Sequence, residues 1–169
     1  MQIAITGRGG QGVLFLTRIL GECALRGGAE VIASETHGMA QRGGSVISTL
    51  KIGPFRGPLI RSGQADLILA LDEGEVETFA HFLSAQGTMI VNSKQNKYGL
   101  AIDATRLAAQ IGSPLMANLV LLGFALQHKK LFCNYELAAE VVKDLSPERY
   151  RQINGQALKV GFRGNIITE

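Results

Sequence analysis

The amino-acid sequence predicts an α/β protein, a three-layer α/β/α sandwich built around a largely parallel sheet. Short apolar runs alternate with helical patterns from the first residues onward, which is typical of this class. The run ADLILALD, at residues 65–72, is apolar almost throughout and fits a strand that is buried on both faces. The first apolar run leads directly into the glycine-rich turn GRGGQG and then into a helical pattern.

The first half of the chain supplies most of the predicted strands. Residues 2–6 are expected to form a buried strand. Residues 11–27 are expected to form a helix, because apolar and small residues recur at helical spacing on one face. Residues 45–52 contain β-branched residues in partial alternation, which favours a strand. The other elements expected in this half are strand 30–34, strand 65–72, helix 73–84 and strand 88–92.

Capping residues mark the helices expected in the second half, after a loop over 93–100. Asp103 or Thr105 should cap a short helix that ends near residue 112. The pair Ser113–Pro114 should open a helix to about residue 128, which is apolar on nearly every face and therefore buried. The last two expected helices run from a cap at Asn134 to residue 144, and from Ser146–Pro147 toward residue 161. These final helices either complete the core or form an appended segment that clasps a neighbour.

The composition limits the classes of function. A chain of 169 residues is long enough to bury a core without cross-links, so a single domain is expected over 1–169. The net charge of +3, without a run of Lys and Arg, is too small for a nucleic-acid binder, so no nucleic-acid partner is expected. No apolar run is long enough to cross a bilayer and no leader precedes the first strand. We therefore expect no membrane partner and a cytoplasmic location.

The two cysteines, Cys23 and Cys133, belong to no CxxC pair. The chain should therefore hold neither an iron–sulfur cluster nor a structural zinc ion by itself, and no metal site is expected. The lack of a disulfide framework fits a reducing compartment. Both thiols are expected to be buried or idle.

The turn at residues 7–12 satisfies two phosphate-binding patterns. The P-loop pattern fails, because Val13 and Leu14 stand where Lys and Ser or Thr would contact phosphate and magnesium. The dinucleotide pattern requires an acid at the end of the second strand, and Glu35 is near that place. A glycine turn at a helix N-terminus exposes backbone N–H groups, which suit a phosphate or a carboxylate. The simpler alternative is a tight crossover that binds nothing.

A second glycine-rich loop follows the second predicted strand. It reads HGMAQRGG at residues 37–44. In a parallel sheet this loop should emerge at the same edge as the first turn, and ligands bind outside the carboxyl ends of such strands. We therefore expect the two loops to form one shared site.

The two loops, together with later segments, carry a resemblance to a known family. The segments are GRGGQG, ETHGMAQRGGSV and ADLILALDEGE, followed by AN and LGFAL downstream. In this combination the chain resembles the γ subunit of 2-oxoacid:ferredoxin (or flavodoxin) oxidoreductases over nearly its whole length. The segment HGMAQRGGSV is most similar to the corresponding segment in the small subunit of the indolepyruvate-type enzymes.

The resemblance implies a subunit of an oxidoreductase complex. Enzymes of this family decarboxylate a 2-oxoacid on thiamine diphosphate and pass electrons through 4Fe-4S clusters to ferredoxin or flavodoxin. Most of them deliver the acyl group to coenzyme A. The family places thiamine diphosphate, its Mg and the clusters in partner subunits. This chain is thus expected to hold no tightly bound cofactor and no catalytic residue, to be inactive alone, and to contribute an interface and access for coenzyme A or substrate.

Nine residues of the two loops and of the buried helix are candidates for contacts with a cofactor. The glycines permit a close turn, and Gln11 is expected to hydrogen-bond across an interface. Arg42 either clamps a carboxylate or phosphate, or fixes the loop or a subunit contact through a salt bridge. Asn118 either binds back to the loops or merely caps its helix, because a buried asparagine must be paired. The candidate residues are Gly7, Gly9, Gly10, Gln11, Gly12, Arg42, Gly43, Gly44 and Asn118.

Two alternative functions remain open from the sequence. In the first, the chain is a free-standing protein that binds NAD or FAD through the first turn, with Glu35 on the ribose. In the second, the chain is a structural scaffold whose two loops are buried in a subunit interface without any ligand.

Overall fold

The fold is organised around a six-stranded mixed sheet, seen in a computed structural model that describes residues 1–36, 43–95 and 97–164. The strand order is β2-β3-β1-β4-β5-β6. Strands β1, β4, β5 and β6 are parallel neighbours, whereas β3 is antiparallel to both β1 and β2. The predicted largely parallel sheet is confirmed. The strands are β1 (Gln2–Arg8), β2 (Val31–Thr36), β3 (Ser45–Ile52), β4 (Ala65–Ala70), β5 (Leu83–Asn92) and β6 (Leu100–Ile102).

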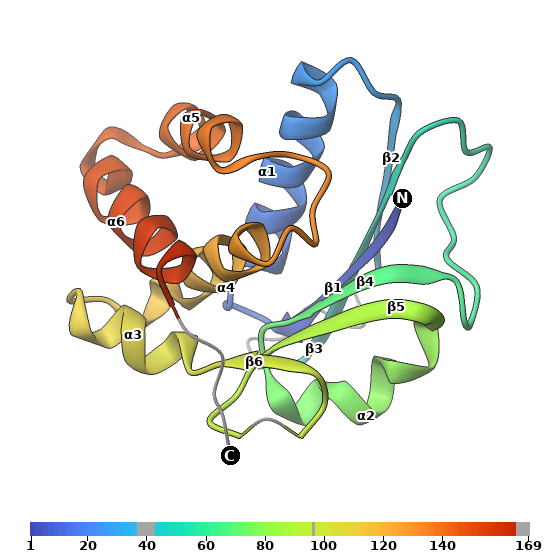
Figure 1. The fold of residues 1–169 in the computed structure, drawn as a ribbon, viewed down its shortest axis with the longest axis horizontal. Coiled ribbons are helices and arrows are strands. Elements are labelled where there is room, and N and C mark those ends of the chain that lie inside the picture. Colours follow the sequence, from blue (N-terminus) through green and yellow to red (C-terminus); the bar gives the residue numbers. More distant parts are fainter. Residues whose placement is uncertain (37–42, 96, 165–169) are drawn as a thin grey trace.

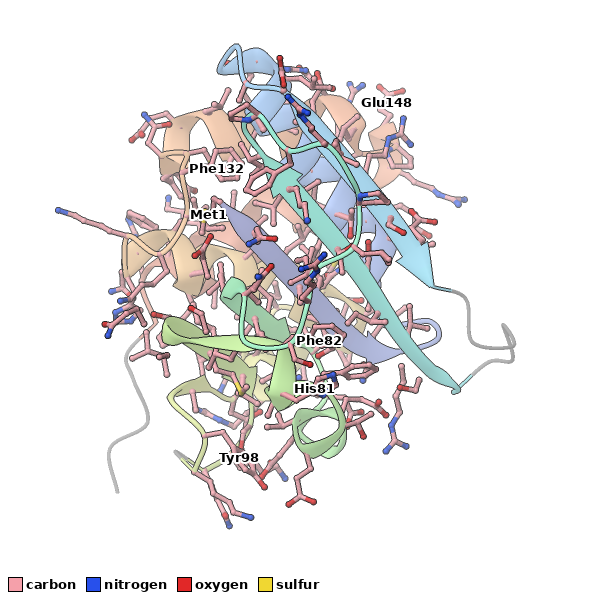
Figure 2. The ribbon with its side chains drawn as sticks, turned by 90° about the vertical axis from the view of Figure 1, so that its right-hand side faces the viewer. Met1, His81, Phe82, Tyr98, Phe132 and Glu148 are labelled. Atoms are coloured by element: carbon pink, nitrogen blue, oxygen red, sulfur yellow. The ribbon has the colours of Figure 1, made fainter. Side chains whose placement is uncertain are left out.

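Helices pack on both faces of the sheet, as expected for the three-layer sandwich, but the two layers differ in thickness (Figure 1). One face carries most of the core, formed by α1 (Val13–Arg26), α3 (Ala104–Gln110), α4 (Ala117–Gln127), α5 (Tyr135–Leu145) and α6 (Arg151–Phe162). The other face carries the short α2 (Val76–Phe79) and the segment between β3 and β4, which contributes Ile60. Figure 2 looks onto this thinner side, with the strands in front of the larger helical layer.

The reversed strand β3 is the main departure from a regular alternation of strands and helices. β2 and β3 are consecutive in the chain and pair antiparallel, from Val31 opposite Ile52 to Thr36 opposite Ile47. β3 then pairs with β1, from Gln2 opposite Lys51 to Arg8 opposite Ser45. The chain therefore returns along β3 between its first two strands, and α1 crosses over β3 to connect them.

Two predicted elements differ from the structure. The helix expected over 73–84 is broken into a 3-10 turn (Glu73–Glu75), the four-residue α2 and a second 3-10 turn (Ala80–Phe82). It ends early because Leu83 already pairs with Ala65 of β4, which draws the chain into β5 five residues before the predicted start. The short β6 was predicted as part of the loop and the segment after it, since three residues carry little periodicity.

Two of the predicted helix caps are confirmed, at the starts of α3 and of α5. The Asp103 carboxylate accepts a hydrogen bond from Arg106 N at 2.9 Å, and the Asn134 side chain accepts one from Leu137 N at 3.0 Å. Ser113 makes no side-chain cap bond, and Pro114 instead begins a 3-10 turn (Pro114–Met116) ahead of α4. Sequence-local hydrogen bonding thus fixes where these helices begin.

Helix α4 is the buried centre of the larger layer. All its residues from Asn118 to Leu126 are buried, in agreement with the predicted apolar helix. A β-carbon added to Gly123 would lie 2.1 Å from Leu158 O of α6, and one added to Gly161 would lie 1.9 Å from Val120 O. The α4 and α6 backbones are therefore in direct contact at two glycines. The last two helices thus contribute buried residues to the core.

The two cysteines meet at the boundary of this layer. Cys23 of α1 is buried and Cys133, just before α5, is half-buried. The Cys23 thiol donates a hydrogen bond to the Cys133 sulfur, and this bond together with burial raises the pKa of Cys23 far above its usual range. The prediction of buried thiols is confirmed for Cys23.

We predict opposite effects for two Gly→Ala substitutions in α6. Gly161→Ala should lower the free energy of unfolding by about 2–3 kcal/mol, because its methyl group would overlap the α4 backbone. Gly155→Ala is the matched control, because a β-carbon there meets nothing within 4 Å. It should raise the free energy of unfolding by up to about 1 kcal/mol through helix propensity. Urea denaturation measures both, and equal effects would contradict the close contact.

Candidate functional site

The candidate site lies at the carboxyl end of β1, where the direction of the sheet's connections reverses. From β1 the chain passes through α1 to β2 and β3 on one side, and later to β4 and β5 on the other. In open α/β sheets a crevice forms outside the strand ends at such a switch point, and ligands bind there. The turns after β1 and after β4 flank this point.

The glycine turn leads from β1 into α1 by two residues with a left-handed backbone. Gly10 has φ 99° and Gly12 has φ 84°, values that residues with a β-carbon rarely adopt. Gly7 pairs with Val46 at the end of β1. Gly12 is the N-cap of α1 and provides no side-chain cap bond. The first-turn N–H groups of α1 therefore lack the side-chain acceptor that usually satisfies them.

The second loop meets the glycine turn directly, as predicted. Gly9 N donates to Gly44 O at 2.8 Å, and Gly43 N donates to Gly9 O at 3.3 Å. The two loops meet because β3 pairs with β1 and begins at the edge where β1 ends. Arg42, the other candidate of this loop, lies outside the described residues, as does His37. The expected contacts of these loops with a ligand stay predictions.

Gln11 is directed inward and braces the turn. Its Oε1 accepts from Arg8 N at 2.7 Å, and its Nε2 donates to Asp72 Oδ2 at 3.1 Å. Both ends of the Gln11 amide are thus engaged within the chain, and the expected hydrogen bond across an interface stays a prediction, for which Nε2 has a second N–H group. The position of Gln11 three residues after Arg8 allows the local bond to Arg8 N.

A charged cluster of Arg8, Asp72 and Glu75 closes the switch point beside the turn. Arg8 Nε lies 3.3 Å from Asp72 Oδ2 and 3.5 Å from Glu75 Oε1. Asp72 Oδ1 also accepts from Gly74 N at 2.9 Å and so caps the 3-10 turn that follows, and the Ser45 hydroxyl donates to Glu75. The cluster links the ends of β1, β3 and β4. Arg8 is therefore neutralised within the chain.

Asn118 packs against the glycine turn from the start of α4. A β-carbon on Gly12 would lie 2.2 Å from Asn118 Nδ2, so only glycine permits this approach. Asn118 Oδ1 accepts from Leu119 N at 2.8 Å, and the side chain is only 6% exposed. Among the described residues, Nδ2 has no hydrogen-bond partner. Of the two expected roles, the hydrogen bond that the structure shows is the local one to Leu119 N, and toward the turn Asn118 makes a packing contact.

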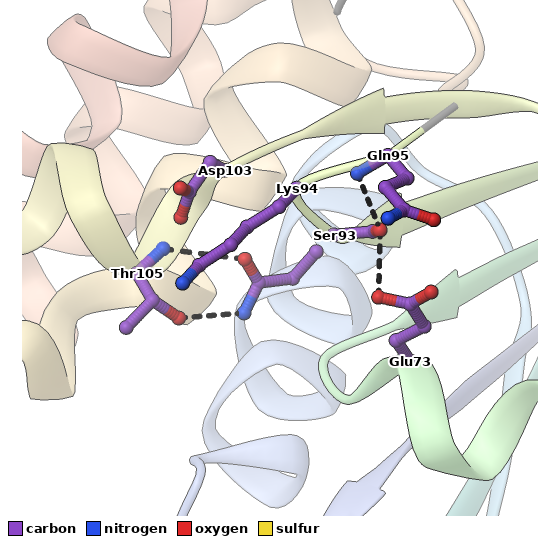
Figure 3. Close-up of a pocket in the computed structure, with 7 residues that line it drawn as sticks. Glu73, Ser93, Lys94, Gln95, Asp103 and Thr105 are labelled. Carbon is purple, nitrogen blue, oxygen red and sulfur yellow. Dashed lines mark hydrogen bonds between the residues drawn. The ribbon is translucent and has the colours of Figure 1, made fainter. Parts of the chain in front are cut away.

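Two adjoining pockets extend from this contact along the strand ends. The smaller, of about 160 Å³, is lined by Gly10, Gln11, Leu71, Asn92, Thr105, Pro114, Leu115, Ala117 and Asn118. The larger, of about 380 Å³, is lined by Glu73, Asn92, Ser93, Lys94, Gln95, Asp103 and Thr105 (Figure 3). Asn92 and Thr105 belong to both pockets, which are therefore neighbours.

Hydrogen bonds hold the wall between the pockets in place. Asn92 Nδ2 donates to Thr105 Oγ1 at 2.9 Å and to Leu71 O at 3.1 Å, and Thr105 N donates to Asn92 Oδ1 at 3.2 Å (Figure 3). The Ser93 hydroxyl donates to Glu73 Oε2 at 2.7 Å. Sequence reasoning did not single out Asn92 or Lys94. Their position at the end of a predicted parallel strand, where ligands often bind, could have identified them from the sequence.

The surface around the glycine turn is apolar and exposed. Leu14 at the start of α1 is 38% exposed, Leu115 before α4 is 73% exposed, and Tyr150 before α6 is 41% exposed. A groove of about 230 Å³ joins Leu115 and Tyr150, with Phe15, Met116 and Pro147 in its walls. We call Leu14, Leu115 and Tyr150 the apolar rim. Groups of exposed large apolar side chains beside a site are typical of interaction surfaces.

The topology argues against the dinucleotide alternative. Because β3 lies between β1 and β2, Glu35 on β2 is two strands away from the glycine turn, about 10 Å in the direction of pairing. In a dinucleotide-binding fold the two strands are neighbours. Among the described residues no group of three His, Cys, Asp or Glu side chains could hold a metal ion, and no described helix is long and apolar enough to span a membrane.

Comparisons with known proteins agree over nearly the whole chain. The model of the family described as pyruvate ferredoxin/flavodoxin oxidoreductase matches residues 2–164. This chain belongs to that family. The indolepyruvate oxidoreductase subunit of Archaeoglobus fulgidus is 31% identical to it, over 98% of this chain and 96% of the relative. The corresponding subunit of Thermococcus kodakarensis is 30% identical, over 95% and 94% of the two chains.

Solved structures share the fold. The γ subunit of a keto/oxoacid ferredoxin oxidoreductase from Geobacter sulfurreducens is 26% identical, with a TM-score of 0.78 over 96% of each chain. A 2-oxoglutarate:ferredoxin oxidoreductase chain from Magnetococcus marinus aligns with a TM-score of 0.79 over 96% of this chain but only 30% of its own length. At 17% identity, this second likeness concerns the fold alone. The chain is thus a γ-type subunit of a multisubunit 2-oxoacid:ferredoxin oxidoreductase.

We predict that Gly12→Ala destabilises the protein more than Gly10→Ala. Both residues have positive φ, so either substitution should cost about 1–2 kcal/mol of backbone strain. Only at Gly12 would the new methyl group also meet Asn118, which should cost about 1–3 kcal/mol more. Urea denaturation of both variants measures the difference.

The double variant Gly12→Ala/Asn118→Ala isolates the contact. It should be more stable than the sum of the two single changes predicts, because removing the Asn118 amide relieves the overlap. Additive effects would mean that Gly12 is required only for its backbone conformation.

Proposed function

We propose that this chain is the small subunit of an indolepyruvate-type 2-oxoacid:ferredoxin oxidoreductase. The observation that carries the proposal is the similarity, at 30–31% identity over nearly the full length of both chains, to subunits named indolepyruvate oxidoreductase. The complex would oxidatively decarboxylate a 2-oxoacid, transfer two electrons to ferredoxin, and release the acyl group as a coenzyme A thioester. The chain's own contribution would be an interface and access for coenzyme A or substrate.

The division of cofactors between subunits follows from what this chain lacks. Its only two cysteines hydrogen-bond to each other in the packed core, whereas a 4Fe-4S cluster needs four thiolate ligands. Among the described residues, no three His, Cys, Asp or Glu side chains are grouped so that they could hold a metal ion. Thiamine diphosphate, Mg²⁺ and the clusters would accordingly be held by partner subunits. The cofactors supply the carbanion and electron chemistry, and this chain can only position and shield.

The glycine turn supports the role in access. Its backbone leads into α1 at an N-terminus without a side-chain cap, where the positive end of the helix dipole favours an anion. Gly43 and Gly44 hydrogen-bond to Gly9 of the turn, and Arg42 directly precedes them in the sequence. An arginine beside exposed N–H groups suits the phosphates of coenzyme A.

The apolar rim supports the role as an interface. Leu14 lies at the start of α1, Leu115 lines the pocket beside the glycine turn, and a groove joins Leu115 to Tyr150. In the Magnetococcus marinus structure the equivalent fold occupies only 30% of a longer chain. The thiamine-binding partner is the proposed occupant, because it would cover this rim and bring its cofactor to the turn.

The identity of the complex can be tested in the native cell. Affinity purification of this chain followed by mass spectrometry should recover a thiamine-binding, cluster-bearing subunit in comparable amount. Oxidation of indolepyruvate should exceed that of pyruvate in the recovered material. Reduction of a dye by the isolated chain with any 2-oxoacid, or tight binding of NAD or FAD in calorimetry, would contradict the proposal.

We predict that Leu115→Asp weakens assembly. A carboxylate at this position would have to be desolvated at the proposed interface, so the amount of partner recovered should fall about tenfold or more. Leu59→Asp is the control, because Leu59 is 75% exposed, close to the 73% of Leu115, and lies in the segment between β3 and β4. Equal recovery with both variants would contradict an interface at the rim.

We predict that Arg42→Ala leaves assembly intact and raises the Michaelis constant for coenzyme A about tenfold, the effect of losing one charged hydrogen bond. The exposed Arg56, in the segment after β3, serves as the control in Arg56→Ala, which should change neither property. Loss of the partner with Arg42→Ala alone would favour the scaffold alternative, in which the loop only fixes a subunit contact.

A further inference from the structure

We propose that the 160 Å³ pocket between the glycine turn and the start of α4 binds a small monocarboxylate with a short apolar tail. The proposal deepens, and in that sense rests on, the access role proposed above. It assigns the α4 side of the glycine turn to a substrate-like carboxylate and leaves the side of the second loop to coenzyme A. The pocket is formed by this chain alone, so binding can be measured without the partner subunits.

The first argument is the convergence of donors on the pocket. Gly10 and Gln11 of the turn and Asn118 of α4 all line it. The 14-residue α1 begins at Gly12 without a side-chain cap and without an acidic residue in its first turn. The 11-residue α4 begins at Ala117, after a 3-10 turn in which Ala117 N donates to Pro114 O; its N-cap Met116 makes no side-chain cap bond and its first turn holds no acidic residue. Two helix dipoles therefore place their positive ends beside one cavity.

The second argument is the Asn118 amide, which is independent of the helix ends. Its Oδ1 is engaged by Leu119 N, whereas its Nδ2 has no partner among the described residues although the side chain is 94% buried, being 6% exposed. Nδ2 is not one of the enclosed side-chain atoms that lack a partner, so it has access to the pocket that Asn118 lines and can donate to a ligand there. An acceptor atom in the pocket would satisfy it.

The third argument concerns the charge of the ligand. Among the described residues that line the small pocket there is no Lys or Arg, and the nearby Arg8 is paired with Asp72 and Glu75. Helix dipoles and one amide can stabilise a single negative charge, but a phosphate dianion would lack a counter-charge. Lys94, which lines the adjoining pocket, adds a positive charge at a distance without entering the small one.

The fourth argument concerns the rest of the ligand. Leu71, Pro114, Leu115 and Ala117 form apolar walls. Apolar cavities of about 150 Å³ accommodate benzene, so a pocket of 160 Å³ has room for a tail of about that size. The exposed Leu115 lies at the edge of the pocket and leaves a route of entry. Together, donors at one end and apolar walls at the other describe an aliphatic or aryl-substituted monocarboxylate.

The test is a titration of the full chain with phenylacetate, followed by NMR of the backbone amides. Phenylacetate should bind at least about tenfold more tightly than phenylacetamide, which has the same ring but no charge to receive a charged hydrogen bond. It should also bind more tightly than inorganic phosphate. The amide signals of Gly10, Gly12 and Ala117 should shift. Equal binding of acid and amide, preference for phosphate, or no binding would overturn the proposal.

Substitutions at the pocket separate binding from folding. Asn118→Asp keeps the oxygen that accepts from Leu119 N, removes the Nδ2 donor and adds a negative charge, so phenylacetate affinity should fall about tenfold or more. Asn134→Asp is the matched control, because it makes the same change at the cap of α5, where aspartate is an equally good cap. Its affinity should remain within about twofold of the unmodified chain.

A second pocket variant covers the case in which Asn118→Asp perturbs α4. Ala117→Leu fills the apolar end of the pocket with a good helix former and without a change in charge, and it should also weaken phenylacetate binding. Unchanged affinity in both pocket variants would overturn the proposal. Because these measurements use the chain alone, a failed partner recovery in the cell would count against the proposed function and leave this result standing.

Discussion

The structure depends on how closely α4 approaches its neighbours. At its start, the Asn118 side chain lies against Gly12 of the turn, and further along it touches α6 through Gly123 and Gly161. Each contact exists because one partner has no β-carbon. Since α4 is buried between the sheet and the outer helices, a shift at any of these points would move the others. The position of the candidate site is thus tied to the packing of the whole helical layer.

The reversal at β3 determines which loops share the site. Because β3 returns along β1, it starts beside the end of β1, and Gly43 and Gly44 hydrogen-bond to Gly9. A parallel β2–β3 pair would need a crossover and would place the start of the second strand at the opposite edge. The short antiparallel connection therefore brings the second loop to the first turn. It also moves Glu35 one strand further from that turn.

The sequence predicted the elements that rest on local chemistry. Asp103 and Asn134 were recognised as caps because their hydrogen bonds are made within three residues. The glycine turn and the buried α4 followed from composition and periodicity. The direction of β3 was not predictable in this way, since alternation shows that a residue is in a strand but not which strand it pairs with.

Long-range partners within the site were also beyond the sequence. The inward contact of Gln11 was not predicted, because it depends on Asp72, which lies 61 residues away in the chain. Arg8 is neutralised by carboxylates from the far side of the switch point for the same reason. Asn92 came to notice only as the last residue of a strand, because its bond to Thr105 requires the folded sheet.

The terminal position of β2 in the sheet gives Glu35 a different physical meaning. An outermost strand presents backbone N–H and C=O groups on one side, and such strands tend to recruit strands from other molecules. Glu35 and Ala33 are both exposed on this strand. Charged side chains on an outermost strand oppose its pairing with a strand of a second copy of the chain. Glu35, which the dinucleotide alternative placed beside a ribose, thus opposes self-association at the edge strand β2.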